Sequence, residues 1–216
     1  TIGLSYSYNF AKNQFGLSGL TNHYVNSAGT VFTDEAYSPL GMGAPTLGVT
    51  VSDMAAAFAT FANNGVHREA RTFTKVYDSN GNVVLDNEQE THEVFSEKTV
   101  NYMNYCLYNA ANHGTGGAAI FAGQTIAGKT GTTSSNRDRW FCGYTSHYTA
   151  AVWVGYDQPE QININTANPA AMMWKKVMQP IHDGLPKQAL YDTGSFRSIA
   201  VCLDSGKLAT NACKLD

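Results

Sequence analysis

Residues 123–133 read GQTIAGKTGTT, and this stretch places a lysine beside hydroxyl groups in two patterns that carry chemistry. Its first eight residues match G-x-x-x-x-G-K-T, the loop that holds nucleotide phosphates on backbone N–H groups. The same letters contain Lys129-Thr130-Gly131, a lysine, hydroxyl and glycine triplet that acyl-transfer enzymes carry near a nucleophilic serine. The two interpretations require different neighbouring elements, so the flanking sequence decides between them.

A phosphate-binding loop must follow a buried strand and open a helix, because the helix N-terminus faces the phosphates. Here residues 131–144 read GTTSSNRDRWFCGY, so polar turn residues lead into aromatic residues typical of a strand. The segment 133–150 leaves no room for the crossover helix that parallel strands need. The run AAVWVGYD ends in Asp157 and imitates a magnesium-holding strand, but it does not supply that helix. The sequence therefore disfavours a nucleotide site.

On a β-strand the triplet has a chemical use. Side chains alternate, so Thr130 and Thr132 share one face, and Lys129 points to the other unless the strand end twists it toward a cleft. Gly131 lets an extended substrate lie close and pair with the backbone. The lysine can supply charge to a carboxylate and help move a nucleophile's proton, while the two hydroxyls hold the carboxylate. Taken alone, a tripeptide favours a simpler interpretation, a surface lysine in a β-hairpin.

The elements that must position this triplet are predicted by capping residues and hydrophobic spacing. Three helices are expected. The first begins at Thr50, with Asp53 in the capping box, and stops at Gly65; the second begins at Ser96 and ends near Gly114. The third begins at Asn168, with Pro169 as its first helical residue. Hydrophobic spacing also predicts which residues face the core. In the first helix these are Met54, Phe58, Phe61 and Ala62, and in the second Val100, Met103, Leu107 and Ala110 or Ala111. In the third they are Ala170, Met173, Trp174, Val177, Met178 and Ile181.

The strands are predicted by alternation and by turn residues. Asn80-Gly81 lies between two alternating runs and predicts a hairpin. Residues 115–157 predict three successive antiparallel strands, with a polar turn at 145–147 between the last two. The third helix should lie across this sheet. The expected fold class is therefore α+β, an antiparallel sheet flanked by helices.

Composition limits the possible functions. The chain has 216 residues, of which 43% are hydrophobic and 12% aromatic, so one sizeable folded core is expected rather than disorder. A net charge of −3 with 14% charged residues provides no basic surface for nucleic acid. The longest apolar runs fall far short of the roughly 20 residues that span a bilayer. No CxxC pair or H-x₃-H spacing suggests a metal site, and we expect neither metal nor cofactor.

The four cysteines fall into two groups. Cys106 lies on the apolar side of the second expected helix and Cys142 within a strand, where buried free thiols are expected. Cys202 and Cys213 bracket the polar loop LDSGKLATNA, and they would close it as a disulfide only if the protein works outside the cytoplasm. The sequence leaves both states of this pair open.

Seven stretches, in the same order and over most of the chain, resemble the transpeptidase domain of the class A (bifunctional) penicillin-binding proteins. Co-linearity of this extent is far more specific than the triplet. The stretches are SPLGMGAPTLGVTVSDMAAAFATFANNGV (38–66), KVYDSNGNVV (75–84), HGTGGAA (113–119), AGKTGTT (127–133), DRWFCGYTSHYTAAVWVGYD (138–157), NPAAMMWKKVM (168–178) and DSGKLATNAC (204–213).

The resemblance implies a fold, a reaction and partners. The fold is that of the penicillin-binding proteins and serine β-lactamases, with the K-T-G triplet on the strand that lines the active site. In the implied reaction a serine attacks the D-Ala-D-Ala end of a peptidoglycan stem peptide, releases the last D-Ala and passes the acyl group to an amine. β-Lactams would acylate the same serine. The implied location is the extracytoplasmic face of the bacterial membrane, with a membrane anchor and a glycosyltransferase domain in the parent protein.

The same resemblance assigns roles to five residues. Lys129 is implied as the active-site lysine, Thr130 as the triplet's hydroxyl and Gly131 as its glycine. Thr132 would bind the carboxylate of a substrate or β-lactam and lend its backbone N–H to the oxyanion hole, and Thr133 would assist.

Two motifs of the family are missing from the expected places. No S-x-x-K occurs in the chain, and we interpret the S-x-N matches at 7–9 and 134–136 as chance. Because Thr1 carries no initiator methionine or signal peptide, we expect residues 1–216 to be the C-terminal part of one transpeptidase domain, with 185–216 as a C-terminal extension. The missing N-terminal part of the domain is then the expected partner that carries the nucleophile.

Two other functions remain compatible with the sequence. The chain could act without chemistry, as a module that binds wall peptides or partners through the K-T-G strand. A fragment of a serine β-lactamase is a weaker alternative, since those enzymes share the triplet but not DRWFCGYT or DSGKLAT. A companion chain that carries S-x-x-K would separate the transpeptidase from the binding module.

Overall fold

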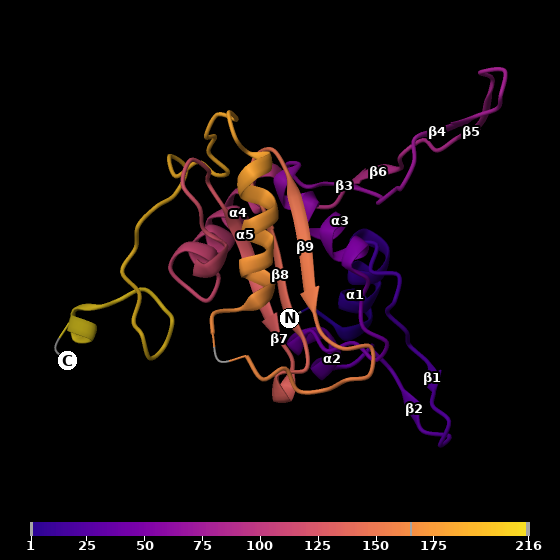
Figure 1. Ribbon diagram of the computed structural model, residues 1–216. Helices are drawn as coiled ribbons and strands as arrows, with labels where there is room; N and C mark the ends of the chain where they lie inside the picture. Colours follow the sequence, from indigo (N-terminus) through magenta and orange to yellow (C-terminus); the bar gives the residue numbers. More distant parts are fainter. Residues whose placement is uncertain (1, 165, 215–216) are drawn as a thin grey trace.

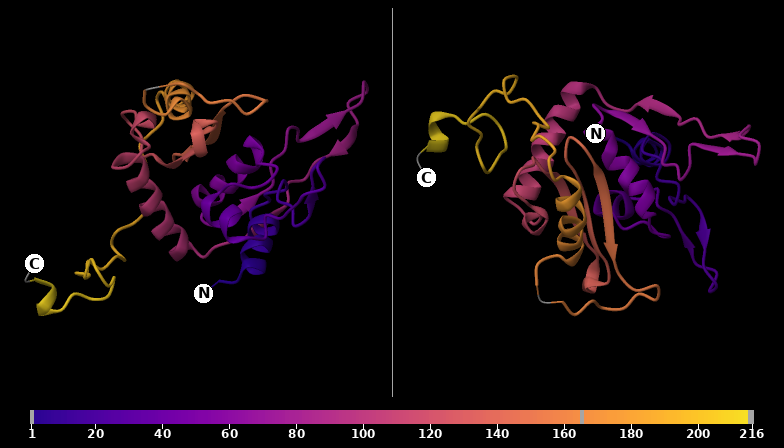
Figure 2. Two further views of the ribbon diagram at one scale, coloured as in Figure 1. Left: turned by 90° about the horizontal axis from the view of Figure 1, so that it is seen from below. Right: turned by 45° about the horizontal axis from the view of Figure 1, so that its top comes forward.

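A three-stranded antiparallel sheet lies at the centre of the computed structural model, which describes residues 2–164 and 166–214. Its strands follow the chain in the order β7 (Ala127–Thr132), β8 (Arg139–Tyr144) and β9 (Thr149–Val154) (Figure 1). Helix α5 (Pro169–Ile181) covers one face of the sheet, and α3 (Val51–Ala62) lies on the other (Figure 2). The predicted α+β fold, an antiparallel sheet flanked by helices, is confirmed.

The register of the sheet is held at a pair of glycines and at a tight turn. Gly128 lies opposite Gly143, and a Cβ atom at Gly128 would come within 2.7 Å of the Cys142 carbonyl oxygen. Between β8 and β9, the Thr145 hydroxyl accepts hydrogen bonds from the backbone N–H groups of His147 and Tyr148. Short polar side chains that bond nearby backbone in this way favour turns. The expected strand–turn–strand arrangement is confirmed.

The three predicted helix starts are also confirmed. Thr50 accepts a hydrogen bond from the backbone N–H of Asp53 at 3.0 Å at the start of α3. Ser96 caps α4 (Glu97–Asn112) through the N–H of Thr99. Asn168 accepts from the N–H of Ala170 at 2.9 Å, and Pro169 follows as the first residue of α5. Each cap satisfies a backbone donor that the first helical turn leaves unpaired.

The core consists of one cluster on each face of the sheet. On the α5 face, Trp174 and Met178 pack against Phe141 of β8. On the α3 face, Phe61 of α3 and Leu107 of α4 pack against Tyr144. Phe141 and Tyr144 can serve opposite faces because the side chains of a strand alternate.

The predicted inner face of α5 is partly wrong. Met173, Val177 and Ile181 are about half exposed, at 50%, 51% and 48%. The buried line instead runs through Ala170, Ala171, Trp174 and Met178. A single sheet face buries a narrow stripe of a helix, and residues one position away from that stripe turn about 100° toward solvent.

The prediction for α4 is wrong at two positions. Met103 is exposed, and the buried polar residue Asn104 takes the inward position. Its Nδ2 donates to the carbonyl oxygen of Leu190 at 2.8 Å, and its Oδ1 accepts from the Tyr144 hydroxyl at 2.5 Å. A buried amide with these partners avoids the usual penalty of polar burial. Cys106, expected to be buried, is exposed because it lies to one side of the buried line; Cys142 is buried as expected.

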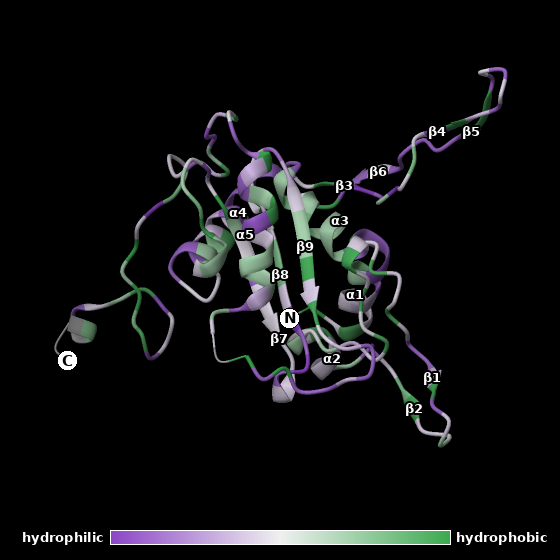
Figure 3. Cartoon of the chain, viewed as in Figure 1, coloured by the Kyte–Doolittle hydropathy of each residue, from purple (hydrophilic) through white to green (hydrophobic). Residues whose placement is uncertain are grey.

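Shorter elements surround the central sheet and its covering helices. The predicted hairpin is confirmed as β4 (Lys75–Tyr77) paired with β5 (Val83–Asp86), and it projects from the body (Figure 1). Hydrophobic residues lie along it in Figure 3, although Val83, Val84 and Leu85 are exposed. The remaining elements are α1 (Leu4–Asn9), a π-helical turn (Phe10–Gln14), β1 (Tyr24–Val25) with β2 (Val31–Phe32), α2 (Tyr37–Met42), β3 (Val66–Arg68) with β6 (Thr91–Glu93), and 3₁₀ turns at Gly117–Ala119, Ser134–Asn136 and Asn211–Lys214.

The segment after α5 first follows α4 and then leaves the body. Asn101 exchanges two hydrogen bonds of 2.7 Å with the backbone of Asp192, and Tyr102 stacks on Phe196. Farther on, Cys202 and Cys213 are free thiols. The last two residues of the expected extension over 185–216 lie outside the described residues. Within the described ranges, no helix combines the length and apolarity needed to cross a bilayer.

Candidate active site

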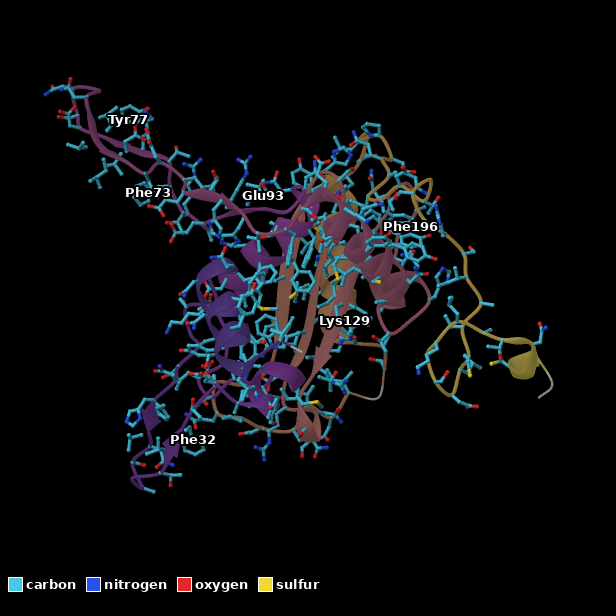
Figure 4. The ribbon with its side chains drawn as sticks, turned by 180° about the vertical axis from the view of Figure 1, so that it is seen from behind. Phe32, Phe73, Tyr77, Glu93, Lys129 and Phe196 are labelled. Carbon is cyan, nitrogen blue, oxygen red and sulfur yellow. The ribbon has the colours of Figure 1, made fainter. Side chains whose placement is uncertain are left out.

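The K-T-G triplet lies on β7, which forms the edge of the central sheet (Figure 4). Among the described strands, β7 pairs with β8 alone. An edge strand presents unpaired N–H and C=O groups to which an extended ligand can add as a further strand. The position of the triplet therefore suits binding of a peptide.

Its side chains divide between the two faces as the sequence predicts. Lys129 lies opposite Cys142 in the register, on the face toward α3. Thr130 lies opposite Phe141, whose ring packs under α5, and Thr132 lies opposite Arg139 on that same face. Both hydroxyls are thus separated from the lysine by the strand itself.

The lysine side of β7 borders a cleft of about 290 Å³. The sheet contributes Lys129, Thr130, Gly131, Trp140 and Cys142 to its lining. The opposite walls are mostly apolar and comprise Ala11, Leu17, Leu20, Pro39, Leu40, Gly43, Pro45, Val49, Met54 and Phe58. Lys129 is exposed, and its Nζ donates to the carbonyl oxygen of Thr130 at 3.0 Å. The ammonium group is therefore available to a group that enters the cleft.

The thiol opposite Lys129 is not a suitable nucleophile. Cys142 is 2% exposed, and burial raises its pKa to about 12. The thiolate is the reactive form of cysteine, so a thiol with this pKa stays protonated and inert at neutral pH. Cys142 therefore does not offer a nucleophile to the cleft.

Thr115, which the sequence did not single out, touches the triplet from the loop after α4. Its Oγ1 lies 2.5 Å from Oγ1 of Thr130. The loop is tightly placed, because a Cβ atom at Gly116 would come within 2.7 Å of the Cα of Ala111. The only sequence signal was a threonine between two glycines in HGTGGAA. If Thr115 donates to Thr130, the Thr130 proton is free to bind a ligand.

The resemblance seen in the sequence implies acylation by penicillin; if the full-length protein is acylated, Thr115→Val should lower the rate about 2- to 12-fold, the effect of one hydrogen bond. Thr115→Ser should restore the rate because it restores the hydroxyl. Rates of reaction with a fluorescent penicillin measure this, with exposed Thr91→Val as the matched control. Equal rates for the valine and serine variants would contradict a positioning role for the Thr115 hydroxyl.

Beyond the triplet, Thr133 is engaged in holding the end of β7. Its hydroxyl donates to Oδ2 of Asp138 at 2.7 Å and accepts from the Asp138 backbone N–H at 2.9 Å. The other Asp138 oxygen accepts from Nε1 of Trp153 on β9. These bonds fasten the turn between β7 and β8 to the third strand, so Thr133 orients the strand end.

The two S-x-N matches do not line the 290 Å³ cleft. Ser7 lies in α1, and its hydroxyl donates to the backbone carbonyl oxygen of Gly3 at 3.1 Å. The second match forms the 3₁₀ turn Ser134–Asn136 that follows β7. This arrangement agrees with their interpretation as chance matches.

The sheet, its covering helices and the K-T-G strand define the class of this protein. A family model for the penicillin binding protein transpeptidase domain matches residues 7–179, and the chain belongs to that family. Curated relatives agree. Penicillin-binding protein 1A of Clostridium perfringens is 36% identical over 164 residues, which are 76% of this chain and 20% of that protein. Penicillin-binding protein 1A of Clostridium botulinum is 33% identical over 97% of this chain and 24% of that protein.

Solved structures share the fold. The PonA1 protein of Mycobacterium tuberculosis in complex with penicillin V superposes with a TM-score of 0.64 at 23% identity, over 86% of this chain and 52% of that one. Penicillin-binding protein 1A from Haemophilus influenzae gives a TM-score of 0.64 at 18% identity, over 97% of this chain and 35% of that one. The family resemblance inferred from the sequence is confirmed. The chain spans 20% and 24% of the lengths of the two curated relatives.

Proposed function

We propose that the protein containing this chain is a peptidoglycan D,D-transpeptidase that β-lactams inhibit. A serine attacks the carbonyl carbon between the last two D-Ala residues of a stem peptide, and the terminal D-Ala leaves with a proton. An amine of a neighbouring strand then attacks the acyl-serine, forms the cross-link and returns the serine. The supporting observation is the position of Lys129 at an open cleft beside the edge strand that carries Thr130 and Thr132.

In this proposal each residue of the triplet has a separate task. Lys129 helps move the proton of the nucleophile, because its exposed ammonium faces the cleft. Thr130 and Thr132 hold the carboxylate of the donor peptide, and the Thr132 N–H contributes to the oxyanion hole. Gly131 gives the donor close access to the backbone, and Thr133 steadies the strand end.

In this proposal the nucleophile lies outside residues 1–216, since these residues contain no S-x-x-K. The largely apolar walls of the cleft suit an amphipathic segment that carries this motif, with its serine toward Lys129. Residues 1–216 would then be the C-terminal part of one transpeptidase domain. The extension over 185–216 lies outside the catalytic part. The activity places the protein on the extracytoplasmic face of the bacterial membrane, held by an anchor elsewhere in the protein.

Intact-mass spectrometry with penicillin tests this function. We expect the full-length protein to gain the mass of one penicillin, on a peptide outside residues 1–216, and the isolated 216-residue chain to gain none. Digestion and peptide mapping locate the adduct. Adduct formation on a serine within this chain would overturn the division of the site, and a full-length protein that takes no penicillin would favour the binding module.

A further inference from the structure

Each face of the K-T-G strand carries its own cation. Lys129 lies on the α3 face, at the cleft, with its Nζ on the carbonyl oxygen of Thr130. Arg139 lies on the α5 face, directly opposite Thr132 in the pairing of β7 with β8. Its Nη1 donates to Oγ1 of Thr132 at 3.4 Å. The guanidinium group is therefore beside a hydroxyl proposed to hold the substrate carboxylate.

From this geometry we propose that Arg139 binds the substrate carboxylate together with Thr132, which leaves Lys129 to proton transfer. The inference rests on the proposed transpeptidase function, because it names the residue that supplies charge at the carboxylate position. It also divides between two side chains the two tasks that the sequence assigned to Lys129 alone.

The surroundings of Arg139 leave its charge uncompensated. Its Nε is buried and has no hydrogen-bond partner among the described residues. No carboxylate oxygen in the described part of the chain lies within 4.0 Å of its guanidinium nitrogens; the salt bridge found there joins Lys75 and Asp86. The neighbouring Asp138 is occupied, since its oxygens accept from Thr133 and Trp153.

A partly buried cation without a counter-ion is costly, because it loses hydration and gains no partner. A carboxylate that reaches the Nη end of Arg139 would supply the missing charge. The planar guanidinium presents several donors in a fixed fork, which matches a carboxylate better than an ammonium does. Arg139 thus has both an energetic and a geometric reason to bind this group.

Lys129 is poorly placed for the same task. Thr130 and Thr132 project from the opposite face of β7, and the strand backbone lies between their hydroxyls and the lysine side chain. A carboxylate bound by Thr132 would lie next to the guanidinium of Arg139 on the neighbouring strand. The ammonium group of Lys129 lies on the other face, at the cleft.

The test compares acylation of the full-length protein by benzylpenicillin and by its methyl ester. Arg139→Gln should lower the second-order rate constant for the free acid about 10- to 100-fold, the effect of losing a charged hydrogen bond. The rate constant of this variant for the ester should stay within about 2-fold of the wild-type value, because the ester offers no anion for the guanidinium to bind. Arg137→Gln is the matched control, since Arg137 is an exposed neighbour outside the triplet's hydrogen bonds.

Arg139→Lys separates charge from shape and replaces the glutamine variant if that one does not fold. It should react with the free acid at a rate between those of wild type and Arg139→Gln. Equal losses toward acid and ester, or no loss toward either, would overturn carboxylate binding by Arg139. A wild-type protein that reacts equally with both compounds would overturn it too and leave the transpeptidase function standing. A wild-type protein that takes neither compound would overturn both.

Discussion

Replacement of Lys129 by alanine in the full-length protein is expected to abolish measurable acylation by penicillin while the fold stays intact. Loss of a positioned group that transfers a proton lowers rates by about 10²–10⁴-fold. The fold should tolerate the change because the side chain is exposed and its hydrogen bond goes to the adjacent residue's carbonyl oxygen. Stopped-flow reaction with a fluorescent penicillin measures the rate. The free energy of unfolding, measured with urea, should change by no more than about 0.5 kcal/mol.

A second variant distinguishes proton transfer from simple attraction. Lys129→Arg keeps the positive charge, but the guanidinium does not give up its proton at ordinary pH. We therefore expect the arginine variant to be as slow as the alanine variant. Lys176→Ala, an exposed lysine on α5, serves as the control and should react at the wild-type rate. An alanine variant that reacts at the wild-type rate would remove Lys129 from the mechanism.

Local signals in the sequence were sufficient to predict the elements that carry this site. The caps at Thr50, Ser96 and Asn168 are formed by side chains within three residues of their partners, so their chemistry is readable along the chain. The turn at Asn80-Gly81 is local for the same reason, and Gly81 has a φ of +84° there. Alternation then placed Lys129 and Thr130 on opposite faces of one strand.

Long-range contacts decided what the sequence could not predict. Asn104 is buried because Tyr144 and Leu190, distant in the chain, satisfy its amide. The apolar side chain of Met103 was the natural choice for that position on spacing alone. Burial of a polar residue depends on partners that no local window contains.

Long-range contacts also decided which residues lie beside the K-T-G triplet. The triplet was recognisable because its chemistry lies within consecutive residues. Thr115 and Arg139 meet it only through a loop placed over β7 and through the register of β8. Register follows from which faces are buried across the whole sheet, so a neighbour across the strands is known only after folding.

The second large effect concerns stability, and it tests the assignment of the buried stripe on α5. Trp174 is fully buried, its ring meets Phe141 edge-on at 5.2 Å, and its Nε1 donates to the carbonyl oxygen of Ala150 at 3.1 Å. Trp174→Ala should lower the free energy of unfolding by about 3–5 kcal/mol, because it leaves a cavity and removes the hydrogen bond to Ala150. Urea unfolding followed by far-UV circular dichroism measures the change.

The matched control for Trp174 is the residue directly before it on the helix. Met173 is 50% exposed, so Met173→Ala should change the free energy of unfolding by no more than about 0.5 kcal/mol. Comparable losses from both variants would mean that α5 buries Met173 as well, as the sequence pattern predicted. A large loss from Trp174→Ala alone would place the stripe of Ala170, Trp174 and Met178 against the sheet. Because that stripe covers Phe141, the cross-strand partner of Thr130, it would also make α5 the support beneath the hydroxyl face of the K-T-G strand.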